Sequence, residues 1–302
     1  MNIICQEIIK KRGKSMGLID DIKKEALSNR TKIQTSDAAK LEKILNNMFY
    51  LEKDVEKESA FVKQVMTRGL ESQERVGLHA SALIVSDKDF CIREQVLSLI
   101  YRQLQGEQIN VGLKRIFEEG NVIHEKWQRL FLRAGYSEVN ELDVTQFNKK
   151  FKISFTPDII CKIPDFFEGK MIGEIKSVNT FQFQRMTHHP SAGKQLQWYM
   201  YLCIEEAKNK GSWNGKDFTK GFVLNDDKNT QEFKPEVYDF DREKVEPFIE
   251  RAEACKYYYD RVFKEGKMVA RPNFAKGSDC KRCSKCNMRD ACYNIGIGRI
   301  KI

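Results

Sequence analysis

Two short apolar runs near the middle of the chain carry charged residues where a buried β-strand is expected. Phe-Thr-Pro-Asp-Ile-Ile-Cys (155–161) contains Asp158, and Met-Ile-Gly-Glu-Ile-Lys-Ser-Val (171–178) contains Glu174 and Lys176. Burying a charge is costly unless a metal ion or an opposite charge compensates it. Residues two apart on a strand point to the same face, so Glu174 and Lys176 share one side of the sheet. The two runs therefore predict neighbouring strands that bring two carboxylates and a lysine to one site.

The rest of the chain alternates between helical and strand-like patterns, which predicts an α/β fold with helices covering a central mixed sheet. The helix at 111–134 is expected to be interrupted at Gly120. We expect a helical N-terminal extension over 1–75 and a main domain over 76–302, closed by a cysteine-ligated segment. Helices are expected from 18–22 onward and at 38–66, 91–105, 111–134, 190–208 and 242–265, and strands at 151–162, 170–178, 219–225 and 231–239.

Composition narrows the class of partner. The formal net charge is +9 with a pI near 9.0, and a basic surface attracts polyanions such as nucleic acid, although a solvated lysine-rich surface has the same composition. No window approaches 18 continuous apolar residues, so we expect no membrane span. The N-terminus lacks the apolar core of a secretory signal, so we expect a cytoplasmic protein, or one in the host cytoplasm if a phage encodes it.

The charged residues on the two strands suit a hard divalent cation. Mg²⁺ and Mn²⁺ prefer carboxylate oxygens such as those of Asp158 and Glu174, and a retained water becomes the attacking hydroxide. Lys176 can orient that water or balance charge on a phosphorane. The Ile175 side chain points into the core, but its carbonyl can reach the metal. His124 is an acceptable additional ligand. The set therefore predicts phosphodiester hydrolysis.

These residues resemble the PD-(D/E)xK nuclease superfamily. Within it, the chain is similar to RecB-like exonucleases, including the CRISPR-associated RecB-like family, over roughly residues 75–302. Four short motifs carry the resemblance: Gly120-x-x-x-His124, Pro157-Asp158, Glu174-Ile175-Lys176 and Gln195-x-x-x-Tyr199.

The resemblance implies a restriction-endonuclease-like core and assigns roles within it. It implies that Lys176 is catalytic and that Gln195 and Tyr199 position the DNA or the active site. Gln197 and Tyr201 form a second, overlapping match, but we prefer Gln195 because the residues beside it then face the core. The implied ligands of Mg²⁺ or Mn²⁺ are His124, Asp158, Glu174 and Ile175.

Four of the nine cysteines cluster near the C-terminus. Without a secretory signal, clustered cysteines favour metal ligation over disulfides. Cys280 can complete a local zinc site with Cys283, Cys286 and Cys292. Alternatively the fourth ligand is Cys91. The RecB-like resemblance implies this second arrangement, in which Cys91, Cys283, Cys286 and Cys292 bind a [4Fe-4S] cluster, with Zn²⁺ as the alternative.

Together these features predict a metal-dependent deoxyribonuclease. We expect an exonuclease that acts on single-stranded DNA or DNA ends, in recombination, repair, replication or CRISPR adaptation. The alternatives are an inactive nucleic-acid-binding module and a zinc-stabilised interaction protein. Trp127, Trp198 and Phe181 are candidates for stacking on bases, with core packing as their alternative role. The N-terminal helices are a candidate site for a protein partner.

Overall fold

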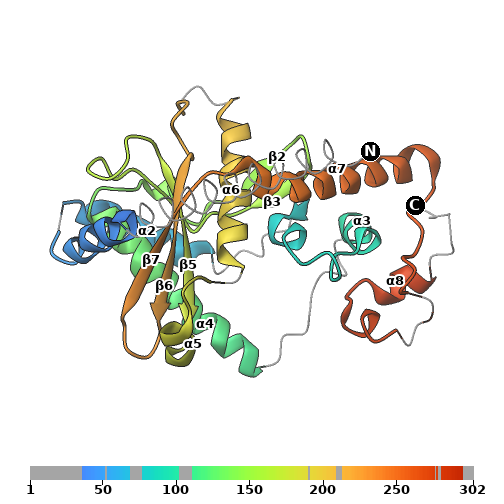
Figure 1. Cartoon of the computed structure of the whole chain (residues 1–302), viewed down its shortest axis with the longest axis horizontal. Helices are drawn as coiled ribbons and strands as arrows, with labels where there is room; N and C mark the ends of the chain where they lie inside the picture. The colour runs from blue at the N-terminus through green and yellow to red at the C-terminus, as the bar shows by residue number, and fades with distance from the viewer. Residues whose placement is uncertain are drawn as a thin grey trace, which may run out of the picture.

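The structure, a computed structural model, describes residues 36–51, 53–68, 77–101, 111–189, 191–208, 213–275, 277 and 280–294. Its centre is a four-stranded mixed sheet with helices on both faces (Figure 1), which confirms the expected α/β class. β4 pairs antiparallel with β5, β5 pairs parallel with β6, and β6 pairs antiparallel with β7. These strands are β4 (Ile159–Cys161), β5 (Met171–Val178), β6 (Lys220–Asp227) and β7 (Phe233–Asp239).

One face of this sheet is covered by α6 (Ala192–Ala207), which packs in turn against α7 (Arg242–Glu265). Leu196 and Met200 of α6 are fully buried against the sheet. The helix approaches closely at Gly221 of β6, because a Cβ there would lie 3.0 Å from Leu196 Cδ1 and 3.1 Å from Met200 Sδ. A glycine at this position therefore allows α6 to pack closely against this face of the sheet.

The opposite face is covered by α4 (Val111–Arg133), by a helix over 36–48 and by α2 (Val55–Arg68). Phe131 of α4 stacks on Phe222 of β6 with ring centroids 5.9 Å apart. Buried residues of the helix over 36–48 belong to the same apolar cluster as the sheet. The N-terminal helices therefore share the core of the main domain, and a separate unit that ends at residue 75 stays a prediction.

The single helix expected over 38–66 is wrong, because the first helix ends at residue 48 and α2 begins only at Val55. There the backbone N–H groups of Lys53 and Asp54 donate to the Arg133 carbonyl at 2.9 and 3.2 Å. That carbonyl lies at the end of α4, where helical partners run out. The turn lets the second helix fold back onto α4, a tertiary effect that helical periodicity does not contain.

Two further expectations about helices also need correction. α4 continues through Gly120 without the predicted interruption. A Cβ at Gly120 would meet nothing within 4 Å, so the position is on an open helix surface, where glycine costs only about 1 kcal/mol. α3 (Ile92–Ile100) ends earlier than the expected 91–105. The expected stretch at 18–22 lies outside the described residues.

A second, three-stranded sheet stands beside the first, with β1 (Leu78–His79), β3 (Ile153–Phe155) and β2 (Gln146–Asn148) in that order. The strand expected over 151–162 is therefore two strands, β3 and β4, in different sheets. Pro157 lies between them and has no N–H to donate to a strand ladder. The break places Asp158 immediately before β4.

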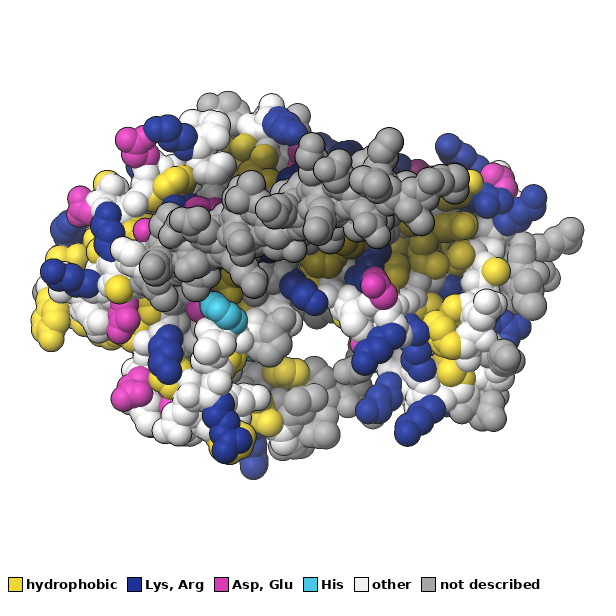
Figure 2. Space-filling model, viewed as in Figure 1, with side chains coloured by type: hydrophobic (Ala, Val, Ile, Leu, Met, Phe, Trp, Pro, Cys, Tyr) yellow, Lys and Arg dark blue, Asp and Glu magenta, His cyan; other side chains and the backbone are white. Residues whose placement is uncertain are grey.

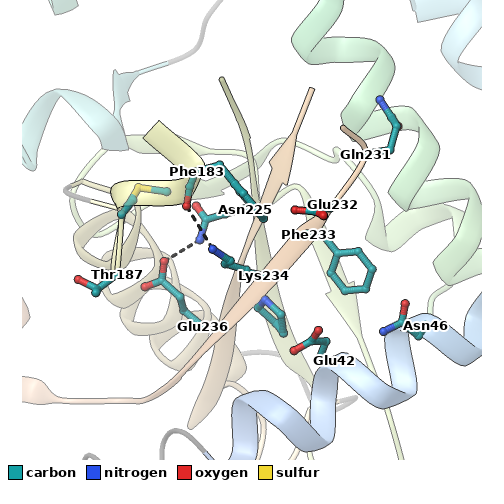
Figure 3. A pocket seen from close by; sticks show the side chains of 12 residues that line it. Glu42, Asn46, Phe183, Thr187, Asn225, Gln231, Glu232, Phe233, Lys234 and Glu236 are labelled. Atoms are coloured by element: carbon teal, nitrogen blue, oxygen red, sulfur yellow. Dashed lines mark hydrogen bonds between the residues drawn. The ribbon is translucent and has the colours of Figure 1, made fainter. Parts of the chain in front are cut away.

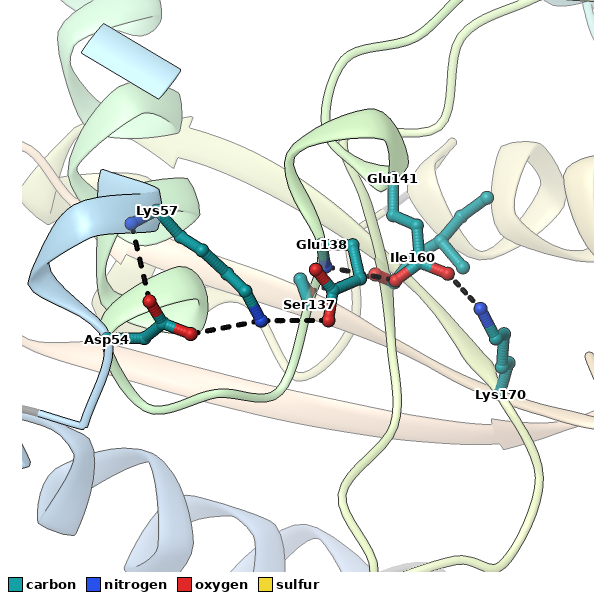
Figure 4. A network of polar contacts seen from close by, with 7 residues as sticks. All are labelled: Asp54, Lys57, Ser137, Glu138, Glu141, Ile160 and Lys170. Carbon is teal, nitrogen blue, oxygen red and sulfur yellow. Dashed lines mark hydrogen bonds and ion pairs between the residues drawn. The ribbon is translucent and has the colours of Figure 1, made fainter. Parts of the chain in front are cut away.

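The turn over 137–141, which lies beside β4, is fixed by polar contacts (Figure 4). Ser137 Oγ donates to the Ile160 carbonyl of β4 at 2.9 Å. Lys57 of α2 pairs with Glu138 at 2.9 Å, and Lys170 pairs with Glu141. This network ties the short edge strand to its neighbours and so fixes the residue that precedes it.

The remaining elements complete the periphery. The C-terminal segment packs beside α3 and the end of α7, around a small cluster that includes Val96, Val262 and Met288. No described helix is long and apolar enough to span a membrane. The elements not yet named are η1 (Ala80–Leu83), η3 (Val139–Glu141), α5 (Thr180–Arg185), η4 (Cys283–Lys285) and α8 (Arg289–Asn294).

Candidate active site

Asp158 takes the place of a missing strand residue at the edge of the sheet. β4 begins only at Ile159, so it pairs with β5 no further than Gly173. The next outward N–H of β5, that of Ile175, donates to Asp158 Oδ2 at 2.7 Å. The Asp158 carbonyl accepts from Gln128 Nε2 of α4 at 2.9 Å. Asp158 is thus held from both the sheet and α4, with its carboxylate beside β5.

Glu174 is buried in this site and only half satisfied. It is 1% exposed, and its Oε1 accepts from Lys176 Nζ at 2.6 Å. Its Oε2 is buried without a hydrogen-bond partner among the described residues. Burial and the negative charge of Asp158 raise the pKa of Glu174 to about 8. A second positive charge at this point would relieve the burial cost of the two carboxylates.

His124 reaches the same site from α4, at the end of β4 where Asp158 lies. Its Nδ1 lies 3.3 Å from Asp158 Oδ1. Burial lowers the pKa of His124, but the negative charges of Asp158 and Glu174 raise it more, so the net shift is upward. The structure therefore brings together His124, Asp158, Glu174 and Lys176, as the sequence predicted, with the Ile175 side chain fully buried on the other face.

Lys176 is held by a short chain of hydrogen bonds from α6. Its Nζ donates to Gln195 Oε1 at 3.2 Å, and Gln195 Nε2 donates to Tyr199 Oη at 3.2 Å. Tyr199 is 2% exposed, and burial, followed by the charges of Glu174 and Asp158, raises its pKa. Tyr199 therefore stays protonated, and from its buried position it orients Gln195.

The overlapping pair, Gln197 and Tyr201, does not reach this site. Gln197 Nε2 donates to the Asp239 carbonyl at 2.8 Å, and its Oε1 accepts the Asp241 N–H at 2.9 Å. These contacts fix the junction between β7 and α7. The geometry agrees with the choice of Gln195.

Sequence reasoning missed three residues around the site. Gln128 lies one helical turn after His124 and holds the Asp158 backbone, a spacing that a search along the helix would have found. His189 accepts the Ala192 N–H at 3.2 Å and so caps α6. Asn225 lies on β6 in register with Lys176, a relation that only the strand pairing reveals.

The cysteines named as cluster ligands lie at one corner of the molecule, beside α3. Cys91 precedes α3, and Cys286 and Cys292 pack on the cluster that α3 shares with α7. Burial raises the pKa of the Cys286 thiol to about 12, and the charges of Glu94 and Cys91 add to the shift. Cys292 Sγ accepts from Arg93 Nε at 3.1 Å.

The eight cysteines that the structure describes are all free. Within the described ranges, no group of three or more His, Cys, Asp or Glu side chains is arranged to hold a metal ion. Neither the predicted [4Fe-4S] cluster nor a zinc site is therefore supported by the geometry of the thiols. The same holds for His124, Asp158 and Glu174 as a set of three, and what fits a cation at the carboxylate site is the single buried and unpartnered Glu174 Oε2.

Comparison with known proteins gives loose structural likenesses. The chain is similar to a crystal structure of LHK-Exo in complex with dAMP (TM-score 0.43, 12% identity, covering 62% of this chain and 90% of that one). It is similar to SSO0001 (TM-score 0.39, 14% identity, 77% and 93%) and to the alkaline exonuclease LHK-Exo from Laribacter hongkongensis (TM-score 0.35, 15% identity, 63% and 94%). No family model and no curated protein matches the chain. The functional conclusion therefore depends on the geometry of the site.

Proposed function

We propose that the chain is a divalent-metal-dependent nuclease of the PD-(D/E)xK type that hydrolyses phosphodiester bonds in DNA. The observation that carries this proposal is the buried Glu174 Oε2, which has no hydrogen-bond partner among the described residues. It lies beside a second carboxylate, Asp158, and the Lys176 ammonium contacts only the other oxygen of Glu174. A buried polar atom left without a partner calls for an explanation, and a cation supplies one.

Each residue of this site would have a separate role in such a reaction. Asp158 and Glu174 would hold Mg²⁺ or Mn²⁺, with His124 and the Ile175 carbonyl as further ligands. The ion, when bound, supplies an acidified water as nucleophile. Lys176 places a positive charge beside the carboxylates, where it can balance the charge that develops on a phosphate. Gln195 holds that ammonium in place, and the protonated Tyr199 holds Gln195.

We infer that the substrate is DNA with a single-stranded portion or a free end. Lys and Arg side chains gather near α8 (Figure 2) and suit a phosphate backbone. The described segment over 280–294, which contains α8, carries the exposed Lys281 and Lys285 and the partly exposed Arg289. Trp127 and Trp198 are fully buried, so core packing is their role. Phe181 is 62% exposed on α5, directly after β5, and the Arg185 guanidinium lies 3.7 Å from its ring centroid. An exposed ring on a fixed helix suits stacking on an unpaired base.

The experiment that tests the proposal is digestion of end-labelled single- and double-stranded DNA with Mg²⁺, Mn²⁺ or a chelator. We expect metal-dependent cleavage by the wild type and a loss on the order of 10²-fold or more in Lys176→Ala. Lys170→Ala is the matched control, because Lys170 also pairs with a carboxylate, Glu141, but away from the site. DNA binding without any cleavage would instead identify an inactive binding module.

We also propose that the cysteine corner binds a metal group, with a [4Fe-4S] cluster ahead of Zn²⁺. Support comes from the buried Arg93, whose Nε donates to Cys292 Sγ at 3.1 Å and so holds this sulfur in the cluster that Cys286 also contacts. Anaerobic purification followed by visible absorption and metal analysis tests this. Iron with visible absorption, lost in Cys286→Ser, supports the cluster. A colourless, metal-free and folded wild-type protein contradicts it.

A further inference from the structure

Asn225 carries a second buried acceptor next to the site that has no explanation so far. It is 2% exposed, and its Oδ1 has no hydrogen-bond partner among the described residues. On β6 it lies in register with Lys176 of the parallel strand β5. Side chains in register on neighbouring strands share a face, so Asn225 stands on the same side of the sheet as the Lys176 ammonium. An orphan acceptor therefore lies next to a donor whose other partners are known.

The orientation of the Asn225 amide is fixed from behind by Glu236 of β7. Asn225 Nδ2 donates to Glu236 Oε1 at 2.6 Å, and Figure 3 shows this contact in the wall of a cavity of about 730 Å³. Glu236 is itself held by the Tyr238 hydroxyl at 2.6 Å and by the His189 N–H at 3.0 Å. Because a carboxylate takes the amide N–H, Oδ1 is the atom left for a donor on the other side.

Lys234, the other neighbour in register with Asn225, is already engaged elsewhere. Its Nζ donates to the Phe183 carbonyl at 3.2 Å and lies 4.2 Å from the Phe183 ring centroid. Lys176, by contrast, makes its shortest hydrogen bond to Glu174, the carboxylate that the proposed function assigns to a metal ion. A divalent cation on Glu174 repels the ammonium from that position. The ammonium then keeps Gln195 Oε1 and needs a further acceptor.

We propose that Asn225 is a positioning residue, whose Oδ1 accepts the Lys176 ammonium when a divalent cation occupies Glu174. The inference depends on the proposed nuclease function, since it needs a cation at that carboxylate. It assigns Glu236 to the same device, because Glu236 keeps the Asn225 amide from turning. Lys176 then stays beside the metal site, and its ammonium is available to the substrate because it no longer contacts Glu174, the proposed metal ligand.

Calorimetric titration with Mn²⁺, without DNA, tests the inference independently of cleavage. Asn225→Leu keeps the volume but removes the acceptor, so the ammonium competes with the metal and Mn²⁺ affinity falls about 10-fold. Asn225→Ala removes the acceptor as well, and it replaces Asn225→Leu in the titration if the leucine variant fails to fold. In a Lys176→Met background, Asn225→Leu has no further effect, because the group that it positions is gone. Asn148→Ala, at an equally buried asparagine on β2, leaves Mn²⁺ affinity unchanged.

Two results overturn the inference. Wild-type affinity in both Asn225 variants is one, and an equal loss with and without Lys176 is the other, since that loss would come from the site's structure. The proposed function fails differently. If the wild type binds no Mn²⁺, or if Asp158→Ala binds it as well as the wild type does, the metal site itself is absent. Binding that needs Asp158 but ignores Asn225 removes only this inference.

Discussion

Two buried glutamates, Glu58 and Glu174, show what separates a structural from a functional carboxylate in this molecule. Glu58 of α2 is 6% exposed and accepts hydrogen bonds from Arg129 at 2.7 Å and from Arg133 at 2.9 Å twice. These partners lower its pKa, Arg133 most. Glu174 accepts one hydrogen bond, and its pKa is raised to about 8 by burial and by Asp158.

The difference teaches that burial alone does not define a site. Glu58 holds α2 against α4, and the fold provides it with two guanidinium groups. Glu174 lies beside another carboxylate, and the fold provides it with one ammonium. The two carboxylates, Asp158 and Glu174, therefore have less positive charge beside them than they need when both are ionised. A cation bound from solution would supply the missing positive charge.

The largest effect should follow from Glu174→Gln, which replaces the buried carboxylate by an uncharged amide. We expect cleavage to fall by on the order of 10²-fold or more, because the site loses a ligand for the metal. Stability of the metal-free protein should hold or rise, because glutamine, unlike Glu174, does not have to take up a proton when the chain folds. Cleavage assays and thermal unfolding in chelator check both. Retained cleavage would break the contrast between the two glutamates.

A smaller effect is expected at Phe181, an exposed ring that we compare with Phe263, another exposed ring to which we assign no function. Phe181→Ala should weaken binding of single-stranded DNA about 10-fold, because a stacked base contributes about 1–3 kcal/mol. Binding is measured by anisotropy with an Asp158→Asn protein, so that cleavage does not interfere. Phe263→Ala is the matched control, since this exposed ring packs on Tyr259 of α7. Equal binding by the Phe181 variant and this control would return Phe181 to the ordinary surface.

Glu58→Gln should do the reverse of Glu174→Gln. We expect a loss of about 1–2 kcal/mol in the free energy of unfolding, reduced from the usual cost of breaking a buried pair because both arginines are partly exposed. Cleavage at a temperature where the variant is folded should match the wild type. Chemical denaturation gives the stability. A variant as stable as the wild type would mean that Glu58 contributes nothing to holding α2.

The finest distinction is the direction of the pH dependence. The folded, metal-free chain keeps a proton on Glu174 that the unfolded chain releases at an ordinary pKa, so this contribution to stability falls as pH rises toward about 8. Glu58 acts in the opposite sense, since its lowered pKa gives stability that is lost as pH falls. Thermal unfolding in chelator should show a shallower decline between about pH 5 and 8 in Glu174→Gln than in the wild type. Parallel curves would contradict the assignment.

Much of this arrangement could be predicted from the sequence, because it follows from local patterns. The apolar run over 171–178 fixed a buried strand, and the two-residue spacing placed Glu174 and Lys176 on one face. The meeting of Asp158 with Glu174 was expected because the two short apolar runs were interpreted as neighbouring strands, and β4 does pair with β5.

The rest depends on tertiary contacts that no local pattern contains. The turn before α2 is set by the end of α4, where the N–H groups of Lys53 and Asp54 donate to the Arg133 carbonyl. The stretch expected as one strand over 151–162 is divided between two sheets. Asn225 gains its meaning only from the register of β6 against β5. The predicted metal ligands show another limit, because among the described residues neither the thiols nor the carboxylates form a group of three arranged to hold a metal ion.

Calorimetric titration of the metal-free wild type and Glu174→Gln with Mn²⁺ or Mg²⁺ tests the central claim most directly. We predict saturable binding by the wild type that is lost or greatly weakened in Glu174→Gln, while Glu58→Gln binds normally. Equal binding by wild type and Glu174→Gln, or none by either, would contradict the claim that the unpartnered oxygen of Glu174 exists to hold a cation.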